Sequence, residues 1–354
     1  MKRKAPAVNV DEDASPARHL LARIQGKLGV EQATMADEEL PSDITDYVST
    51  QCATLDYIIG QPGIPVGRLT TVFGKEGGGK TTLTLHLIAE TQRRGGIAML
   101  LDSECRFSRD RAVRLGVHLD DLIVLSGDTL EKCLTDIEES IVLMREDYPD
   151  TLLTIVYDSL AGSPTEATLS KGIGEHTVAR AANIVSQSFP RIVPLVARAR
   201  VALIIVNQLR TYINASGDPR NRERRKVMKT AAMVAEGPLV FYSSLMLYVT
   251  STGLYPDKDN PEGIDVRVEV RKNSIAPGEG KQCEFPISYL HGVDKMEAKL
   301  TLLEQLGHIK RSGGWYSYAC LDKKFQRKDF EDVLQEFPEL EEFVKAAPTL
   351  WQSE

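Results

Sequence analysis

The sequence predicts an α/β fold with a mostly parallel central sheet, because apolar strand-like runs alternate with helical segments over most of the chain. Two further runs, near 244–251 and 265–273, alternate apolar with polar residues, which is typical of an antiparallel pair at one edge of a sheet. From about residue 288 the pattern changes to two or three helices around a segment at 313–318, which indicates a small α+β domain. The expected strands lie at 69–73, 97–102, 122–125, 152–157 and 201–206, and the expected helices lie near 81–94, 108–115, 130–145 and 176–199.

A glycine-rich segment follows the first of these strands and fits the pattern G-x-x-x-x-G-K-T. Its residues are Gly74, Lys75, Glu76, Gly77, Gly78, Gly79, Lys80, Thr81 and Thr82. Between a strand and a helix, such a loop turns its backbone N–H groups inward, and the helix N-terminus adds partial positive charge. Lys80 would reach the β- and γ-phosphates, and Thr81 would ligate Mg²⁺. The segment therefore predicts that the chain binds a nucleoside triphosphate.

Composition narrows the class of protein. The chain has 354 residues, of which 42% are hydrophobic, enough for one large α/β core with additional segments. It contains no run of about 18 apolar residues, so no membrane span is expected, and its first residues lack the apolar stretch of a secretory signal. Five scattered cysteines without a C-x-x-C pair favour reduced thiols over a zinc site. We expect an intracellular, cytoplasmic protein.

Polar residues follow three other expected strands. The strand at 97–102 ends in Asp102 and is followed by Glu104, the strand at 152–157 is followed by Asp158, and the strand at 201–206 leads to Gln208. Because the carboxyl ends of parallel strands face the ligand, these side chains are expected beside the phosphates. Asp158 is the candidate for the Mg²⁺ shell. Glu104 is the candidate for orienting the attacking water, with Asp102 as a competitor, and Gln208 could sense the γ-phosphate.

A long basic segment, from 210 to about 236, follows Gln208. Between 216 and 230 it has six basic residues and two acidic ones, a local net charge of +4 in a chain whose net charge is −7. Such a patch can track a sugar-phosphate backbone, and Tyr212 or Ile213 could stack on or wedge between bases. The alternative is a solvated, charged loop without a ligand. At the other end of the chain, Ser15 and Pro16 begin a short helix whose apolar stripe must be buried on its own domain or on a neighbour.

With these pieces assembled, the chain resembles the RecA family of DNA strand-exchange recombinases from roughly residue 17 to 346. The resemblance rests on the segments at 63–68, 74–85, 102–104, 114–117, 156–161, 207–210 and 313–318. It is greater to a phage-encoded member than to a typical bacterial one. The resemblance implies a RecA-like P-loop ATPase core, and it divides the chain into a disordered tail (1–14), an oligomerisation helix with linker (15–50), the core (51–287) and a C-terminal domain that binds duplex DNA (288–354).

The resemblance also implies roles for individual residues. Glu104 matches the family's catalytic glutamate, Asp158 its Mg²⁺-associated aspartate and Gln208 its γ-phosphate sensor. Two DNA-binding loops are implied at about 165–178 and 210–237, with Val178 and Ile213 inserted between base triplets. The implied DNA-binding residues are Val178, Arg180, Arg210, Ile213, Arg222, Arg224, Arg225, Lys226 and Lys229. Phe241 falls at the position of the family's interface phenylalanine, and Lys272 at that of a lysine that reaches the neighbour's ATP.

The chain departs from the family pattern at several positions. Ser274 stands where the family often has a second edge-strand lysine, so cross-subunit catalysis is weaker or supplied differently. We expect Arg271 on the other face of that strand. Arg111 stands where an adenine-stacking tyrosine is expected, and a guanidinium can still stack on a base. The second DNA loop is longer and richer in arginine than usual, and no acidic C-terminal tail is present, so no tail-based brake on duplex capture is expected.

The resulting prediction is a DNA-dependent ATPase, with ATP and Mg²⁺ as cofactors, that acts in DNA recombination and repair. It forms a helical homo-oligomeric filament on single-stranded DNA and exchanges strands with a homologous duplex. A single-strand-binding protein or a loading mediator is a candidate further partner. The alternatives are a RecA-like hexameric DNA helicase or motor, and a non-catalytic, ATP-gated recombination mediator that assists another recombinase.

Overall fold

The computed structural model describes residues 15–28, 33–38, 40, 43–170, 178–216, 226–257, 259–318 and 324–352. The chain forms two compact units, which divide between Asp43 and Ile44. The smaller unit contains helix α1 (Pro16–Leu28), where Arg18 pairs with Asp37 and Glu38. The apolar residues of α1 are exposed or half-buried, and Leu20 is 55% exposed.

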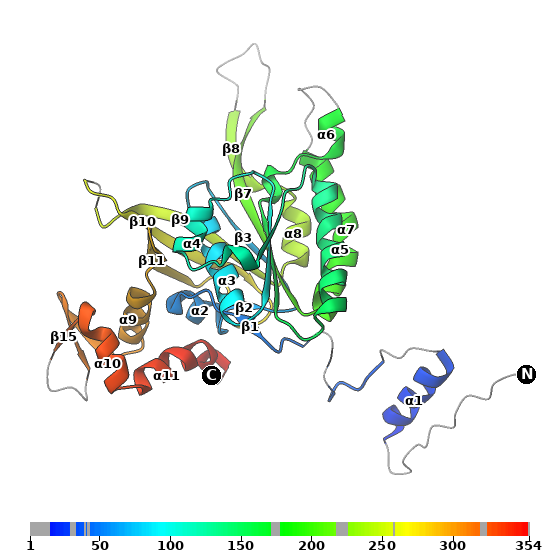
Figure 1. Cartoon of the computed structure of the whole chain (residues 1–354). Coiled ribbons are helices and arrows are strands. Elements are labelled where there is room, and N and C mark those ends of the chain that lie inside the picture. The colour runs from blue at the N-terminus through cyan, green and yellow to red at the C-terminus, as the bar shows by residue number, and fades with distance from the viewer. Residues whose placement is uncertain are drawn as a thin grey trace, which may run out of the picture. The chain divides into compact units, whose positions relative to one another are not determined.

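The larger unit is organised around one ten-stranded sheet (Figure 1). Six strands are parallel to their neighbours, in the spatial order β9 (Leu245–Tyr255), β3 (Leu69–Gly74), β7 (Val201–Ser216), β6 (Leu153–Asp158), β4 (Ile97–Asp102) and β5 (Leu122–Leu125). Beyond β9 the sheet continues with the antiparallel strands β10 (Gly263–Asn273), β11 (Gln282–Ser288) and β12 (Gly292–Val293), while β8 (Lys226–Met233) pairs with the outer half of β7. The predicted fold class is confirmed.

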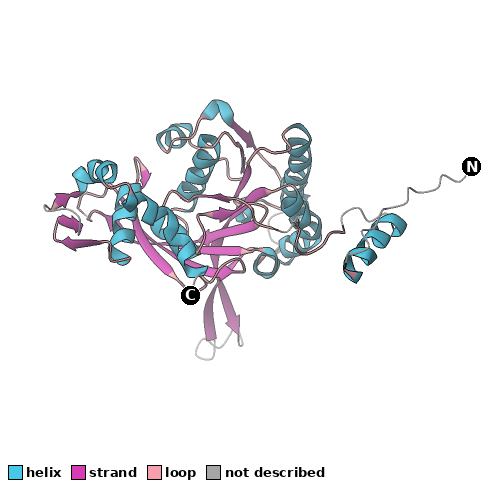
Figure 2. Ribbon diagram, turned by 90° about the horizontal axis from the view of Figure 1, so that it is seen from below, coloured by secondary structure: helices cyan, strands magenta, loops and turns pink. Residues whose placement is uncertain are grey.

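Helices cover both faces of the sheet because successive residues of its central strands point to opposite sides. Leu100, Val156 and Ile204 join one buried cluster with helices α2 (Ala53–Ile59) and α3 (Lys80–Arg93). Met99, Ile155 and Leu203 join a second cluster on the other face. That face carries α5 (Leu130–Asp147), α7 (Val178–Arg198) and α8 (Glu236–Tyr242). Figure 2 shows the helices on either side of the strands.

Shorter elements connect these layers. They are β1 (Tyr47–Val48), which pairs with β2 (Ile64–Pro65), the helices α4 (Arg109–Arg114) and α6 (Glu166–Ser170), and 3₁₀ turns at Leu119–Asp121 and Leu160–Gly162. Within the described residues, no helix is both long enough and apolar enough to cross a membrane.

Two parts of the sheet differ from the sequence-based prediction. The strand expected to end at 206 continues to Ser216, and it forms an antiparallel hairpin with β8 from Leu209 opposite Met233 to Ser216 opposite Lys226. Backbone hydrogen bonds thus form two strands in part of a segment that the sequence analysis treated as a loop. The antiparallel pair expected at the sheet edge is present as β9 and β10, but β11 and β12 extend the sheet past it.

The C-terminal residues form a third buried cluster with its own small sheet. It contains α9 (Lys295–Gln305), β13 (Ile309–Ser312), β14 (Trp315–Tyr318), β15 (Phe325–Gln326), α10 (Phe330–Glu336), α11 (Glu339–Ala346) and 3₁₀ turns at Arg327–Asp329 and Ala347–Gln352. The strand before it is joined to the core by buried His86 of α3, whose Nε2 accepts the Val293 backbone N–H at 3.0 Å. Burial, with Lys295 and Arg111 nearby, lowers the pKa of His86 to about 4.

Candidate active site

The glycine-rich segment forms the turn between β3 and α3, as its pattern predicted. Gly77 and Gly79 have φ angles of +73° and +96°, which L-residues rarely adopt, and Gly79 caps the N-terminus of α3. A Cβ atom on Gly79 would lie 2.8 Å from Cδ1 of Ile287, so the loop packs against β11. Lys80 Nζ donates to the carbonyls of Gly74 (3.1 Å) and Lys75 (2.7 Å), and burial lowers its pKa.

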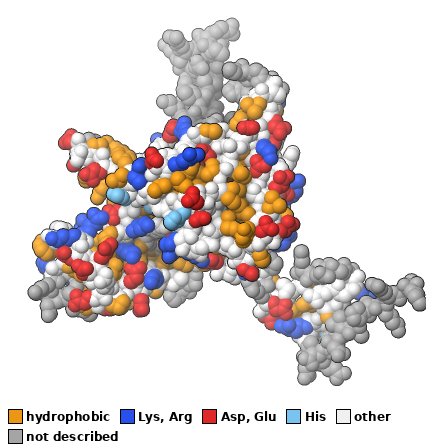
Figure 3. All heavy atoms as spheres, in the orientation of Figure 1, with side chains coloured by type: hydrophobic (Ala, Val, Ile, Leu, Met, Phe, Trp, Pro, Cys, Tyr) orange, Lys and Arg blue, Asp and Glu red, His pale blue; other side chains and the backbone are white. Residues whose placement is uncertain are grey.

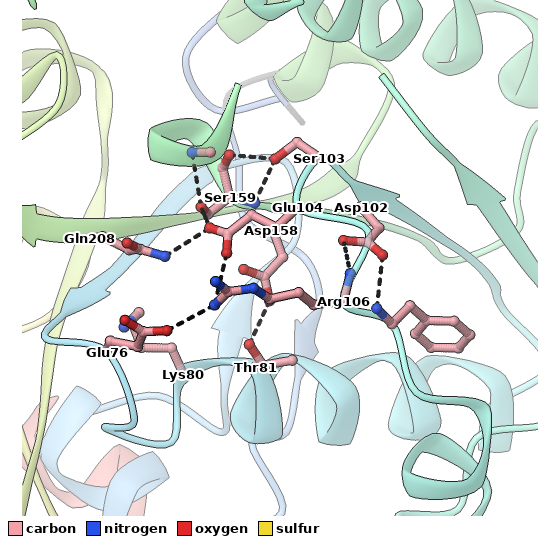
Figure 4. Close-up of polar contacts among 12 residues, drawn as sticks. Glu76, Lys80, Thr81, Asp102, Ser103, Glu104, Arg106, Asp158, Ser159 and Gln208 are labelled. Carbon is pink, nitrogen blue, oxygen red and sulfur yellow. Dashed lines mark hydrogen bonds and ion pairs between the residues drawn. The ribbon is translucent and has the colours of Figure 1, made fainter. Parts of the chain in front are cut away.

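A pocket of about 470 Å³ opens above this loop. Its walls come from the loop, the carboxyl ends of β4 and β6, Gln208 of β7, and Ile264, Ile287 and Tyr289 from the antiparallel extension. The strand ends that the sequence predicted to converge therefore do so (Figure 4). This is the arrangement of a parallel α/β sheet that binds its ligand at the carboxyl edge.

Thr81 and Asp158 lie together at the start of α3. The Thr81 hydroxyl donates to Asp158 Oδ2 at 2.7 Å. Burial raises the pKa of Asp158, which a bound cation would counteract. No group of three or more His, Cys, Asp or Glu side chains in the described residues could hold a metal by itself. A hydroxyl and a carboxylate nevertheless fit Mg²⁺, which takes few protein ligands and completes its shell with phosphate oxygens and water.

Glu104 is held from three directions at the end of β4 (Figure 4). Its Oε1 accepts hydrogen bonds from Gln208 Nε2, at 2.7 Å, and from the Ser159 hydroxyl. Its Oε2 lies 3.2 Å from Nη1 of Arg106. Gly162 permits this position, because a Cβ there would lie 2.5 Å from Glu104 Cγ. The carboxylate is therefore fixed in place before any substrate binds.

Asp102 has a different environment from Glu104. Its two oxygens accept the backbone N–H groups of Arg106 (3.2 Å) and Phe107 (2.8 Å). Ser103 secures the neighbouring strand, since its Oγ donates to the Ser159 carbonyl and accepts the Ser159 N–H. Both carboxylates line the pocket, but the oxygens of Asp102 are occupied by the turn after β4, and the choice of Glu104 over Asp102 stays a prediction.

One part of the pocket wall, called the base end below, is mostly apolar. It is lined by Phe107, Ile264, Ile287, Tyr289 and Arg111. Arg111, on α4, donates from Nη2 to Thr82 Oγ1 at 2.5 Å, and burial lowers its pKa. Apolar side chains with one planar cation form a suitable surface for a nucleotide base.

Comparison with known proteins shows the family of the chain. Residues 18–294 match the RecA N-terminal domain. The chain is 33% identical over 317 residues to Protein RecA of Thermus thermophilus, a match that covers 89% of this chain and 88% of the relative. It is 35% identical over 301 residues to Protein RecA of Zymomonas mobilis. That match covers 85% of this chain and 80% of the relative. The chain belongs to the RecA family.

Two residues that the RecA resemblance places at a subunit interface lie side by side. Phe241 of α8 is 76% exposed, and Lys272 Nζ donates to the backbone carbonyls of Val240 (2.7 Å) and Phe241 (3.3 Å). The neighbouring Arg271 lies over the Tyr248 ring, 5.0 Å from its centroid, and pairs with Glu269. Ser274 donates to the carbonyl of Ser244 at 3.1 Å.

The DNA-binding residues implied by the RecA resemblance are only partly described. Val178 begins α7, and Arg180 on the same helix is half-buried, with no partner for its Nη1 among the described residues. Arg210 and Ile213 lie on β7, and Lys226 and Lys229 on β8, where the backbone pairing alone is described. Arg222, Arg224 and Arg225 lie outside the described residues.

Sequence reasoning missed Arg106, Ser159 and Gly162. Arg106 follows Glu104 by two positions, so a cation just after a strand-end carboxylate was a visible signal. Ser159 and Gly162 reach Glu104 from the next strand in the sheet, a contact that no local pattern reveals. These three residues complete the surroundings of the candidate catalytic carboxylate.

Proposed function

We propose that this protein is a DNA-dependent ATPase that forms a helical filament on single-stranded DNA and exchanges strands with a homologous duplex. RecA-family membership supports the class of activity. The observation that carries the proposal is the 2.7 Å hydrogen bond from Gln208 to Glu104, because Gln208 lies on the strand that continues into the β7–β8 hairpin. One side chain thus touches both the candidate catalytic carboxylate and the base of the candidate DNA-binding segment.

Each of the pocket residues has its own role in the hydrolysis of ATP. Lys80 and the loop N–H groups bind the β- and γ-phosphates, and Thr81 and Asp158 hold Mg²⁺. Mg²⁺ would neutralise charge on the phosphate oxygens. Glu104 orients a water molecule toward the γ-phosphorus and accepts its proton as the bond to the leaving oxygen breaks. Arg111 stacks on the base at the apolar end of the pocket.

Gln208 couples nucleotide state to the DNA-binding segment. When a γ-phosphate enters the pocket, its oxygens compete with Glu104 for the Gln208 amide. A change of partner moves the side chain at the point where β7 leaves the buried sheet and enters the hairpin. ATP binding would then order the DNA contacts, and hydrolysis would release them, so pairing depends on ATP binding rather than on turnover.

Assembly into a filament is supported by apolar surface on both units. Leu20 of α1 is exposed, and Ile123 and Val124 of β5 are 42% and 44% exposed on the last strand of the sheet. Figure 3 shows hydrophobic side chains gathered on the face of the core that is turned to the viewer. We propose that α1 docks on an adjacent copy, with Phe241 and Lys272 facing that copy's nucleotide. Such a contact would hide the open edge of the sheet.

The segments outside the pocket would bind DNA. Val178 and Ile213 would insert between bases, and the basic residues of the second loop would neutralise phosphates. The C-terminal cluster, with exposed Trp315 and Arg311 stacked on Tyr316, would gather duplex DNA. Replacing Arg222, Arg224 and Arg225 by Ala should weaken DNA binding and reduce its dependence on salt. If the dependence of DNA affinity on salt is unchanged, the loop is a solvated segment that binds no ligand.

The first test is ATP hydrolysis with and without single-stranded DNA, at moderate salt with Mg²⁺. The proposal predicts strong stimulation by DNA, and Gln208→Ala should abolish the stimulation while ATP still binds. Strand exchange should proceed with a non-hydrolysable ATP analogue. Tight DNA binding without stimulated turnover would instead favour the non-catalytic mediator, and a requirement for turnover in strand exchange would contradict the coupling argued here.

A further inference from the structure

Arg106 lies between two carboxylates at the mouth of the pocket. Its Nη1 is 2.9 Å from Oε1 of Glu76, on the phosphate loop, and 3.2 Å from Oε2 of Glu104 (Figure 4). Its backbone is fixed, because Asp102 accepts its N–H, whereas its side chain is 66% exposed. The hydrogen bond to Glu76 and the charge of Glu104 raise its pKa, so it stays a cation. A fixed backbone with an exposed side chain allows movement within the site.

The balance of charges in the pocket indicates a function for the Arg106 side chain. The pocket is lined by four carboxylates, Glu76, Asp102, Glu104 and Asp158, and by three cations, Lys80, Arg106 and Arg111. Lys80 donates to carbonyls of its own loop and Arg111 to a threonine hydroxyl. Arg106 is the pocket cation whose described partners are both carboxylates. A polyphosphate would bring further negative charge beside Glu76 and Glu104, which strengthens the demand for a positive group there.

We propose that Arg106 transfers from Glu76 to the γ-phosphate and stabilises the charge that develops during hydrolysis, acting within its own subunit. This inference rests on the proposed ATPase activity. The planar guanidinium has five N–H donors, so it can keep its contact with Glu104 while another N–H reaches a phosphate oxygen. Water forms the new bond to the γ-phosphorus, the bridging oxygen leaves with the electron pair, and Glu104 takes the proton. Arg106 exchanges no proton and only binds the anion.

An arginine that stabilises the γ-phosphate within its own subunit also accounts for the departure from the family pattern at Ser274. Ser274 occupies a position where a second cation was expected, and its hydroxyl donates to the Ser244 carbonyl of its own chain. It therefore brings no charge to any phosphate. Arg106 supplies a positive group next to Glu104 without help from a second copy.

The test compares Arg106→Ala with Arg109→Ala, a matched exposed arginine three positions away that does not line the pocket. Steady-state hydrolysis is measured with DNA, and binding of Mg²⁺·ADP is measured with and without aluminium fluoride, which mimics the phosphoryl group in transfer. Arg106→Ala should lower kcat about 10²-fold, the usual effect of removing one charge-stabilising donor. It should weaken the aluminium fluoride complex by a similar factor and ADP alone by less than about three-fold. Arg109→Ala should change none of these quantities.

A second comparison separates direct contact from an effect through Glu104. In a Glu104→Gln background, Arg106→Ala should still weaken the aluminium fluoride complex, and loss of that effect would overturn the inference. So would equal weakening of ADP and its aluminium fluoride complex, which indicates general attraction of anions. If the wild-type protein hydrolyses ATP and the Arg106→Ala variant is equally active, the inference about Arg106 is refuted but the proposed function stands. A wild-type protein that hydrolyses no ATP would remove the proposed function as well.

Discussion

The two ends of the pocket are built in opposite ways. At the phosphate end, polar side chains from consecutive residues of one loop and from adjacent strand ends contact one another, as in the bonds of Glu104 and Asp158. At the base end, Phe107 before α4, Ile264 of β10 and Ile287 of β11 line the wall around Arg111, together with Tyr289 after β11. The first end is a dense polar network, and the second is an apolar surface with a single cation.

Under the proposed function, this difference would place phosphate binding and base selectivity in separate parts of the pocket wall. The phosphate end makes contacts whose geometry is demanding, so one displaced atom matters. The base end makes broad contacts that tolerate replacement. Substitutions at the phosphate end should therefore alter turnover by orders of magnitude, whereas those at the base end should alter the preference among nucleotides by small factors.

Lys80→Ala should have the largest effect. It removes the buried ammonium that spans the phosphate loop, so triphosphate affinity should fall at least about 10²-fold and turnover should be undetectable. The fold should persist, because the lysine contacts loop carbonyls that water can also satisfy. Calorimetric titration with ATP and a thermal melt measure both quantities. Retained triphosphate binding would place the phosphate site elsewhere.

Glu104→Gln should have the second largest effect on turnover. The amide keeps the shape of the side chain but cannot accept a proton from water, so turnover should fall about 10³-fold. ATP-dependent DNA binding should remain, since Lys80 and the loop are unchanged. Hydrolysis and fluorescence-detected DNA binding are measured together. Simultaneous loss of both would assign Glu104 a structural role.

Gly162→Ala should be intermediate. A Cβ atom at this position would lie 2.5 Å from Glu104 Cγ, so the carboxylate must move by several tenths of an ångström, and turnover should fall about ten-fold. The control is Gly253→Ala, because the nearest atom to a Cβ there is Asp265 Oδ2, at an ordinary contact distance of 3.9 Å, and Gly253 does not line the pocket. The ratio of the two kcat values measures the effect. Equal activity of the two variants would show that the position of Glu104 is not critical.

Arg111→Ala should have the smallest effect on turnover and should test the base end directly. With the guanidinium gone, kcat for ATP should stay within about two-fold, while the ratio of kcat/KM values for ATP and a pyrimidine triphosphate should change by several-fold. Competition between the two nucleotides provides the measurement. A large loss of kcat would mean that Arg111 serves the phosphates, through its contact with Thr82, and would end the division between the two regions.

The sequence predicted which polar side chains converge on the phosphate loop, but apart from Arg111 it did not predict the residues of the base end, for a physical reason. Lys80, Thr81, Asp158 and Gln208 lie on a local motif or at strand ends that topology brings together. Ile264 lies on β10, Ile287 on β11 and Tyr289 just after β11. They reach the pocket only through contacts with the phosphate loop, which is far away in the sequence, and β11 was not expected at all. The hairpin of β7 and β8 was missed because its residues do not alternate between apolar and polar as a half-buried strand does, although their backbone groups can still pair.

The hydrogen bond between His86 and Val293 has a consequence for how the molecule responds to its surroundings. It connects the helix that begins at the phosphate loop with the strand that leads to the C-terminal cluster. Only a neutral imidazole can accept this N–H, and with a pKa of about 4 the ring is neutral in any ordinary buffer. The junction is therefore independent of pH in ordinary buffers. Together with the packing of the C-terminal cluster on α2, it gives a shift of α3 on nucleotide binding a route to that cluster. Acidification below about pH 4 would protonate the ring and remove this hydrogen bond.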